Sequence, residues 1–198
     1  SGWNRNEYDF DIVDTPEEVL QFVREKNREI KSEPTEGRTV IAGARLLAGY
    51  AWPWTKDNNN YGEVKDVDLG SVKLAWNNRH VGSEWAVNKS EQVKEEVGCV
   101  HTSQGLEFDW VGVFIGNDLK YDPRKEELYA CIDNYYDKGG KNGLGKTKAE
   151  REKNLLKYVC RCYRVLLSRG IRGARVFCCN PELRDYLREK LKEAQNNG

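Results

Sequence analysis

Short apolar segments alternate with amphipathic helical segments along this chain, and this alternation limits the fold more than any other feature. The strongest helical pattern covers residues 149–168, where apolar residues recur on one face and basic residues occupy the opposite face. Gly170 ends that pattern, a strand pattern follows over 174–178, and a capped helix pattern covers 181–194. Strands that alternate with helices in this way predict an α/β fold with a mainly parallel sheet.

The remaining elements are predicted from the same periodicities. Alternating apolar and acidic residues predict a strand over 8–13, and a capping pattern at Thr15 predicts a helix that ends near Asn27. Further apolar runs predict strands over 45–52, 72–76, 84–87, 97–102 and 110–115. Residues 117–147 are polar and rich in glycine, so we expect a flexible, exposed insertion there. The 198 residues fit a single domain.

Charge and cysteine content narrow the functional classes. The chain has 32 basic and 32 acidic residues, so its net charge does not by itself indicate an anionic partner. Basic residues nevertheless gather between Arg151 and Arg175, where eight of them accompany only one acid, Glu152. The six cysteines have no zinc-binding or disulfide spacing, and no secretory signal or membrane-length apolar run is present. These features predict a cytoplasmic protein with reduced thiols and no membrane partner.

Two segments carry the residue types that chemistry requires. Residues 100–109 read Val-His-Thr-Ser-Gln-Gly-Leu-Glu-Phe-Asp and join two predicted strands, so we expect their polar side chains near the carboxyl end of a parallel strand, where α/β folds commonly bind ligands. Residues 163–170 read Tyr-Arg-Val-Leu-Leu-Ser-Arg-Gly and place Arg169 at the end of a helix. A guanidinium that is free to reach out from such a position suits a phosphate group.

These two segments resemble the fifth and sixth signature motifs of superfamily 1 helicases. The first matches through His-Thr-Ser-Gln-Gly-Leu-Glu-Phe-Asp, and the second through Leu-Leu-Ser-Arg-Gly. Residues 44–54, 97–119 and 163–179 are also similar to the C-terminal part of a bacterial, Schlafen-related family of DNA/RNA helicases. The resemblance covers most of the chain and leaves 117–147 as its divergent part.

The resemblance implies a division of labour between two RecA-like domains that clamp ATP. The first domain of the same polypeptide would hold the phosphate-binding loop, the adenine pocket and the Mg²⁺ carboxylate. This chain would be the second motor domain only, with no metal ligands and no tightly bound cofactor of its own, and it would be inactive when isolated. DNA or RNA is the expected partner, and whether the isolated chain counts as an enzyme stays open.

The resemblance also assigns site residues one by one. Arg169 matches the catalytic arginine finger. Three residues match the nucleotide side of the fifth motif, namely Gln104, Gly105 and Glu107. Two residues match the side that faces the nucleic-acid backbone, namely His101 and Thr102.

Several alternatives stay open at this point. Residues 140–147 read Gly-Lys-Asn-Gly-Leu-Gly-Lys-Thr, which fits the phosphate-loop pattern, and would allow a self-contained nucleotide-binding protein; the polar segment before them is a poor buried strand. A nucleic-acid-binding module with degenerate ATPase function is the other alternative. Arg169 would then be an ordinary helix-end cation, Glu107 a turn cap and His101 a strand-end histidine. Four basic residues of the 149–168 helix form either a solvated face or a nucleic-acid contact, namely Lys153, Lys157, Arg161 and Arg164.

Overall fold

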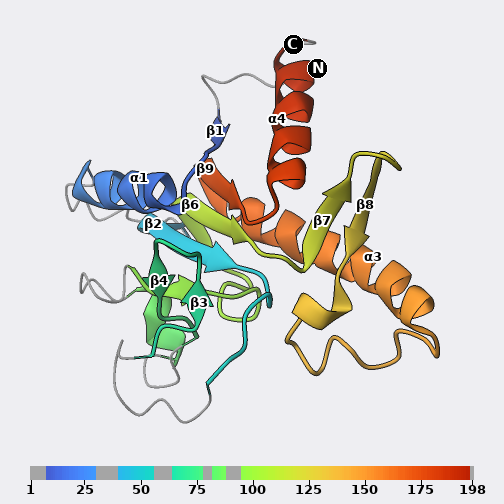
Figure 1. Cartoon of the computed structure of the whole chain (residues 1–198). Helices are drawn as coiled ribbons and strands as arrows, with labels where there is room; N and C mark the ends of the chain where they lie inside the picture. The colour runs from blue at the N-terminus through green and yellow to red at the C-terminus, as the bar shows by residue number, and fades with distance from the viewer. Residues whose placement is uncertain (1–7, 30–39, 56–63, 78–81, 88–94, 197–198) are drawn as a thin grey trace.

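A central sheet of five parallel strands organises the domain, in the order β1-β9-β6-β2-β5 (Figure 1). The structure, a computed structural model, describes residues 8–29, 40–55, 64–77, 82–87 and 95–196. The sheet strands are β1 (Asp9–Ile12), β2 (Val40–Ala48), β5 (Val97–Gly98), β6 (Glu107–Ile115) and β9 (Gly170–Cys178). Both central strands, β6 and β9, are nine residues long and mostly buried, as expected for parallel strands that are covered on both faces.

Helices cover both faces of this sheet. They are α1 (Pro16–Glu29), α3 (Lys148–Leu167) and α4 (Pro181–Asn196). Helix α1 packs in one hydrophobic core together with residues of β2 such as Leu46, whereas α3 and α4 contribute to a second core that includes Val113 of β6 and Val176 of β9. This arrangement is an α/β fold of the RecA-like type, and it confirms the predicted fold class. None of the helices in the described ranges is both long and apolar enough to cross a bilayer.

Smaller elements lie beside the sheet. They are the hairpin strands β3 (Val67–Asp68) and β4 (Lys73–Leu74), the hairpin strands β7 (Leu119–Asp122) and β8 (Glu127–Ala130), and the 3-10 helices η1 (Gly82–Ala86) and η2 (Ile132–Asn134). The β7–β8 hairpin stands between α3 and α4 in Figure 1, and Tyr121 stacks on Tyr186 of α4 with ring centroids 4.2 Å apart. Segment 117–147, expected to be an exposed insertion, therefore includes secondary structure that packs on two helices; its flexibility stays a prediction.

Several predicted strands are too long, and one is wrong. The strands predicted over 45–52 and 72–76 end at Ala48 and Leu74. Residues 82–86 form η1 and not part of a strand over 84–87. The strand predicted over 97–102 ends at Gly98 and forms the outermost strand of the sheet. Its continuation folds into a turn because the Cys99 carbonyl accepts the Ser103 amide at 3.0 Å, which replaces strand pairing.

Candidate functional site

The turn between β5 and β6 is braced by its own hydroxyl groups. The Thr102 hydroxyl accepts a hydrogen bond from the Cys99 amide at 2.8 Å and lies 3.1 Å from the Cys99 carbonyl, to which it donates. Ser103 is fully buried, and its hydroxyl donates to the same carbonyl at 2.9 Å. Thr102, assigned by resemblance to the nucleic-acid side, therefore also holds the turn that carries its neighbours.

Gly105 is the residue at which this segment reaches solvent. Its φ of +75° lies in the left-handed region, which a residue with a Cβ enters only at a cost, and no atom lies within 4 Å of the position a Cβ would take. Gln104 beside it is exposed, and Glu107 is partly buried. The backbone at Gly105 is thus open to the approach of a ligand.

Arg169 is held in place and is not the freely extended cation that the sequence suggested. Its guanidinium donates to the Leu106 carbonyl at 3.1 Å, and its Nε donates to the Val165 carbonyl at 3.1 Å. A third bond reaches the Ser168 hydroxyl at 3.2 Å. The helix end explains this placement, because the last carbonyls of a helix lack intrahelical partners and accept such donors.

The two motif segments meet at the amino edge of the sheet. The Phe108 amide donates to the Arg169 carbonyl at 2.8 Å, and Phe108 is in register with Gly170. Glu107 is the first residue of β6, so the expectation of a site at a carboxyl end is wrong for this part of the segment. The reason is topological: a chain that leaves β5 and enters the parallel strand β6 has to return to the amino edge before it pairs.

His101 lies toward the opposite edge. Its ring is 5.6 Å from the ring of Tyr50, which follows the carboxyl end of β2, and its Nε2 is 4.0 Å from a carboxylate oxygen of Asp137. The side chain is 58% exposed, so the Asp137 contact leaves much of the ring open to solvent. The structure therefore places His101 away from Arg169. Leu106 belongs to the same sequence segment as His101, but its carbonyl is bound by Arg169.

The phosphate-loop pattern at 140–147 has the wrong surroundings for a nucleotide. No strand leads into it, because η2 and a loop precede the first glycine. The Glu150 carboxylate accepts the backbone amides of Lys146 at 3.0 Å and Thr147 at 3.2 Å, and Thr147 caps α3 in a capping box with Glu150. In a working phosphate loop such amides cradle phosphate oxygens, whereas here a carboxylate already binds them.

No role was predicted from the sequence for Asp118, a buried acid at the carboxyl edge of the sheet. Asp118 is 1% exposed and accepts the Tyr163 hydroxyl at 2.7 Å, while the Gly116 amide donates to the same hydroxyl oxygen at 3.1 Å. Burial raises the pKa of Asp118 to about 7, although the Tyr163 hydrogen bond opposes the shift. Periodicity gives no signal for this contact, because the two residues are 45 positions apart in sequence.

Asp109 is a second acid that the structure brings into view. It is 8% exposed, pairs with Arg172 at 3.0 Å and accepts the Gly43 amide at 3.1 Å. The carboxylate thereby links β2, β6 and β9 near the amino edge. Its position inside the fifth-motif segment was a signal that the sequence reasoning did not use.

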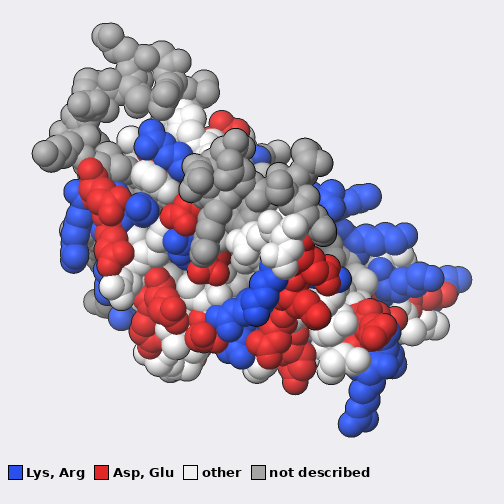
Figure 2. Space-filling model, turned by 90° about the horizontal axis from the view of Figure 1, so that it is seen from above, with Lys and Arg blue, Asp and Glu red and all other residues white. Residues whose placement is uncertain are grey.

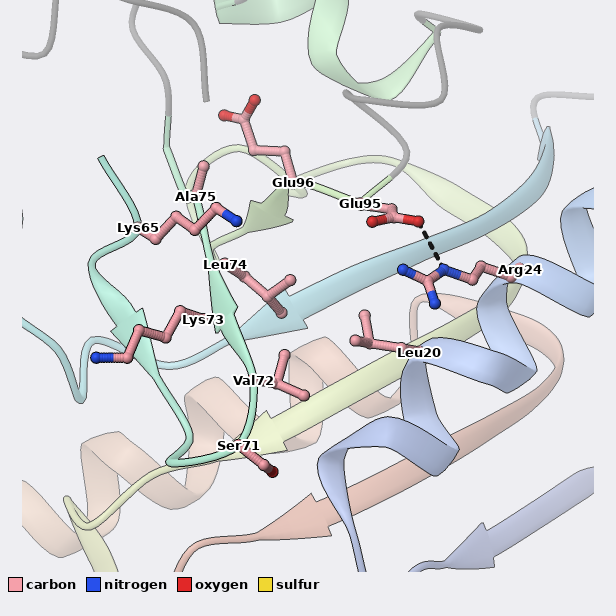
Figure 3. Close-up of a pocket in the computed structure, with 10 residues that line it drawn as sticks. All are labelled: Leu20, Arg24, Lys65, Ser71, Val72, Lys73, Leu74, Ala75, Glu95 and Glu96. Atoms are coloured by element: carbon pink, nitrogen blue, oxygen red, sulfur yellow. Dashed lines mark hydrogen bonds and ion pairs between the residues drawn. The ribbon is translucent and has the colours of Figure 1, made fainter. Parts of the chain in front are cut away.

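A separate cavity lies between α1 and the β3–β4 hairpin (Figure 3). Its volume is about 420 Å³, and Arg24 and Glu95 pair across it with a 2.6 Å contact. Leu20 and Val72 contribute apolar surface to its wall. None of the predicted site residues lines this cavity, so it has no part in the motif-based site. Within the described ranges, no group of three or more His, Cys, Asp or Glu residues is arranged to hold a metal ion.

Comparison with known proteins places this geometry in a family. The uncharacterized protein YPL245W of Saccharomyces cerevisiae is 25% identical over 190 residues, which cover 94% of this chain and 38% of the yeast protein. The chain thus spans well under half the length of this relative. No solved structure matches the chain. Residues 1–180 match the family described as Schlafen group 3, DNA/RNA helicase domain, and this range includes both motif segments. The chain therefore belongs to the Schlafen group 3 DNA/RNA helicase domain family.

Proposed function

We propose that this chain is the second RecA-like motor domain of a superfamily 1, nucleic-acid-dependent ATPase. It would act with an ATP-binding RecA-like domain of the same polypeptide. The observation that carries the proposal is the contact between the two motif segments, in which Arg169 donates to the Leu106 carbonyl at 3.1 Å. Two segments that serve one nucleotide have to converge on one side of the sheet, and these two are joined by side-chain and backbone hydrogen bonds.

Arg169 is the proposed arginine finger. Its planar guanidinium would stabilise the charge that spreads over the transferred phosphoryl group in the transition state. All three of its present acceptors are neutral oxygens, and none is a carboxylate. Neutral acceptors bind a cation less strongly than an ionised phosphate does, so closure onto ATP would draw the side chain away from them.

The remaining motif residues divide between two partners. Gln104 and Glu107 would contact the nucleotide side, where Gly105 allows close approach of the backbone. ATP would bring its Mg²⁺ with ligands from the other domain, and this chain would supply no metal ligand. His101, toward the other edge, and Thr102 would face the DNA or RNA backbone.

The test compares Arg169→Ala and Arg169→Lys in the full-length protein at saturating nucleic acid. We expect kcat for ATP hydrolysis to fall by about 10³-fold or more in the alanine variant, with a much smaller change in ATP affinity. Lysine should not restore kcat, because a point charge cannot reproduce the planar fork. Near-normal kcat in both variants would show that Arg169 is a structural helix-end residue.

A second candidate is a nucleic-acid-binding module with degenerate ATPase function. The observation in its favour is that Arg169 already uses three of its five N–H donors, on Val165, Leu106 and Ser168. In that case the full-length protein binds oligonucleotides, shows no hydrolysis above background, and does not respond to loss of Arg169. ATPase turnover that depends on added DNA or RNA would rule this candidate out.

A further inference from the structure

We propose that the outer face of α3 is a separate nucleic-acid contact that binds the phosphate backbone. Four residues form it, namely Lys153, Lys157, Arg161 and Arg164, and we call them the basic stripe. The inference deepens the proposed function. It rests on that function in one respect, namely that the bound polyanion is DNA or RNA. It places the bound strand on a surface apart from the segment that resembles the fifth motif.

Helical geometry puts the four cations in one row. Their spacings of four, four and three residues bring them to the same side of a helix with about 3.6 residues per turn. The opposite side of α3 is buried against the sheet, through Leu155, Val159, Tyr163 and Leu166. Lys153 and Arg164 are eleven positions apart, so the row is about 17 Å long at about 1.5 Å per residue.

The stripe residues have no partners within the part of the chain that the structure describes. All four side chains are exposed, and none makes an ion pair or a side-chain hydrogen bond there. Arg184 and Arg188 on α4 differ, because both pair with Asp14, at 3.3 and 2.8 Å. The charges of Arg184 and Arg188 are thus satisfied within the fold, whereas those of the stripe are free to bind an external anion.

The exposed face of α3 lacks the acidic residues that alternate with basic ones on a typical solvated helix face. The acids of α3 are Glu150, which binds the helix cap, and Glu152, which lies 4.0 Å from Lys148. No acid follows between 153 and 167. Like charges four residues apart destabilise a helix, and a Glu among them would relieve the repulsion. The sequence keeps this unfavourable row in a chain whose total charge is balanced.

The shape of the stripe favours a linear polyanion. Figure 2 shows Lys and Arg side chains that project on the right-hand side of the molecule, the side on which both α3 and the β7–β8 hairpin lie in Figure 1. A membrane-binding helix would offer its apolar face to lipid, but the apolar face of α3 is buried in the core. A protein partner would require an apolar centre in the contact, and the stripe presents only charged groups. A phosphate backbone needs a row of cations and no apolar surface.

Position on α3 also links the stripe to the proposed arginine finger. Helix α3 ends at Leu167, and Arg169 lies two residues later with its Nε bound to the Val165 carbonyl. Arg169 thus lies just beyond the helix that carries the stripe and is hydrogen-bonded to its last turn. Nucleic acid bound to the stripe would act on the same element that positions Arg169.

The experiment measures binding of fluorescent single-stranded DNA and RNA to the full-length protein as a function of salt. The test variant replaces the four stripe residues with Gln, which removes charge and keeps helix propensity. The control removes the same charge from exposed residues elsewhere, through Arg124→Gln, Lys125→Gln, Lys190→Gln and Lys192→Gln. We expect the stripe variant to bind at least about tenfold more weakly, with a slope of log K against log salt smaller by about 3, since each single-strand contact contributes about 0.7. The control should match the wild type.

Unchanged affinity and slope in the stripe variant would overturn the inference, as would an equal loss in the control. Loss of binding to phosphatidylserine vesicles without loss of oligonucleotide binding would also overturn it, in favour of a lipid surface. If the fourfold variant does not fold, the pairs Lys153→Gln/Lys157→Gln and Arg161→Gln/Arg164→Gln are each expected to remove about half of the slope change. The proposed function fails separately: normal kcat in Arg169→Ala contradicts it whatever the stripe variant does.

Discussion

The two edges of the parallel sheet hold their polar residues in different ways. At the carboxyl edge, Asp118 is 1% exposed and shares a hydrogen-bonded cluster with Tyr163 and Gly116. At the amino edge, Gln104 and Gly105 face solvent, and Arg169 is only partly buried. The edge at which α/β folds commonly bind ligands is here partly filled by the protein's own side chains.

This difference indicates separate roles for the two edges. Changes in the buried cluster at the carboxyl edge should alter the free energy of unfolding. Changes of the exposed residues at the amino edge, such as Gln104, should alter ATP hydrolysis and leave stability nearly unchanged. The predictions below test that separation, from the largest expected effect on stability to the smallest.

Asp118→Asn should abolish a large part of the pH dependence of stability. The folded pKa of Asp118 is raised to about 7 from 3.8, so its protonated form stabilises the fold below about pH 4, and this stability is lost as pH rises toward 7. The loss amounts to about 4 kcal/mol at most, from roughly three pKa units at about 1.4 kcal/mol each. Urea unfolding at pH 5 and pH 8 measures about 3 kcal/mol of this loss, because about two of the three pKa units lie above pH 5. Equal pH dependence in wild type and variant would contradict the burial argument.

Gly116→Ala should destabilise the carboxyl edge by about 1–3 kcal/mol, as overpacked sites do. A Cβ at this position would lie 2.1 Å from the Ala51 Cβ, and the backbone has to shift to relieve the contact. Gly139→Ala is the control, because its nearest neighbour is a flexible Asp137 oxygen at 3.3 Å. Thermal unfolding of the two variants gives the comparison, and similar melting temperatures would argue against tight packing at this edge.

Thr102→Val should cost about 1–2 kcal/mol of stability, because it removes the hydroxyl that accepts the Cys99 amide. Thr102→Ser keeps the hydroxyl and should retain most of the stability. Denaturant unfolding and oligonucleotide binding are measured on both variants. If valine leaves stability unchanged and weakens binding alone, Thr102 belongs functionally with the exposed residues and not with the turn.

Gln104→Ala should change stability by less than about 0.5 kcal/mol, since the side chain is exposed and makes no hydrogen bond within the described ranges. ATP hydrolysis by the full-length protein should nevertheless fall, if the residue contacts the nucleotide. Differential scanning calorimetry and steady-state kinetics on the same preparation separate the two effects. A destabilised variant with normal kcat would reverse the roles assigned to the edges.

Local sequence patterns predicted those helices and strands whose periodicity is contained within their own segment. Helix α3 was predicted over 149–168 and is observed over Lys148–Leu167, because its apolar periodicity lies within the segment. The strand patterns at 110–115 and 174–178 are confirmed as the C-terminal parts of β6 and β9. The strand predicted over 84–87 is wrong, since such short apolar runs carry no period that distinguishes a strand from a helical turn.

The sequence by itself also determined which residues form the motif segments, because their identity and order are written in the chain. Only the tertiary structure decided where they lie. Return of the chain from β5 to β6 brought Glu107 to the amino edge and left His101 near Tyr50 on the other side. Arg169 reaches the same edge because it immediately precedes β9, which pairs with β6. Burial of Asp118 against Tyr163 depends on residues 45 positions apart, and such a contact exists only after the sheet and α3 have packed. Long-range pairing of this kind leaves no trace in local periodicity, since the free energy that enforces it comes from burial and not from neighbours along the chain.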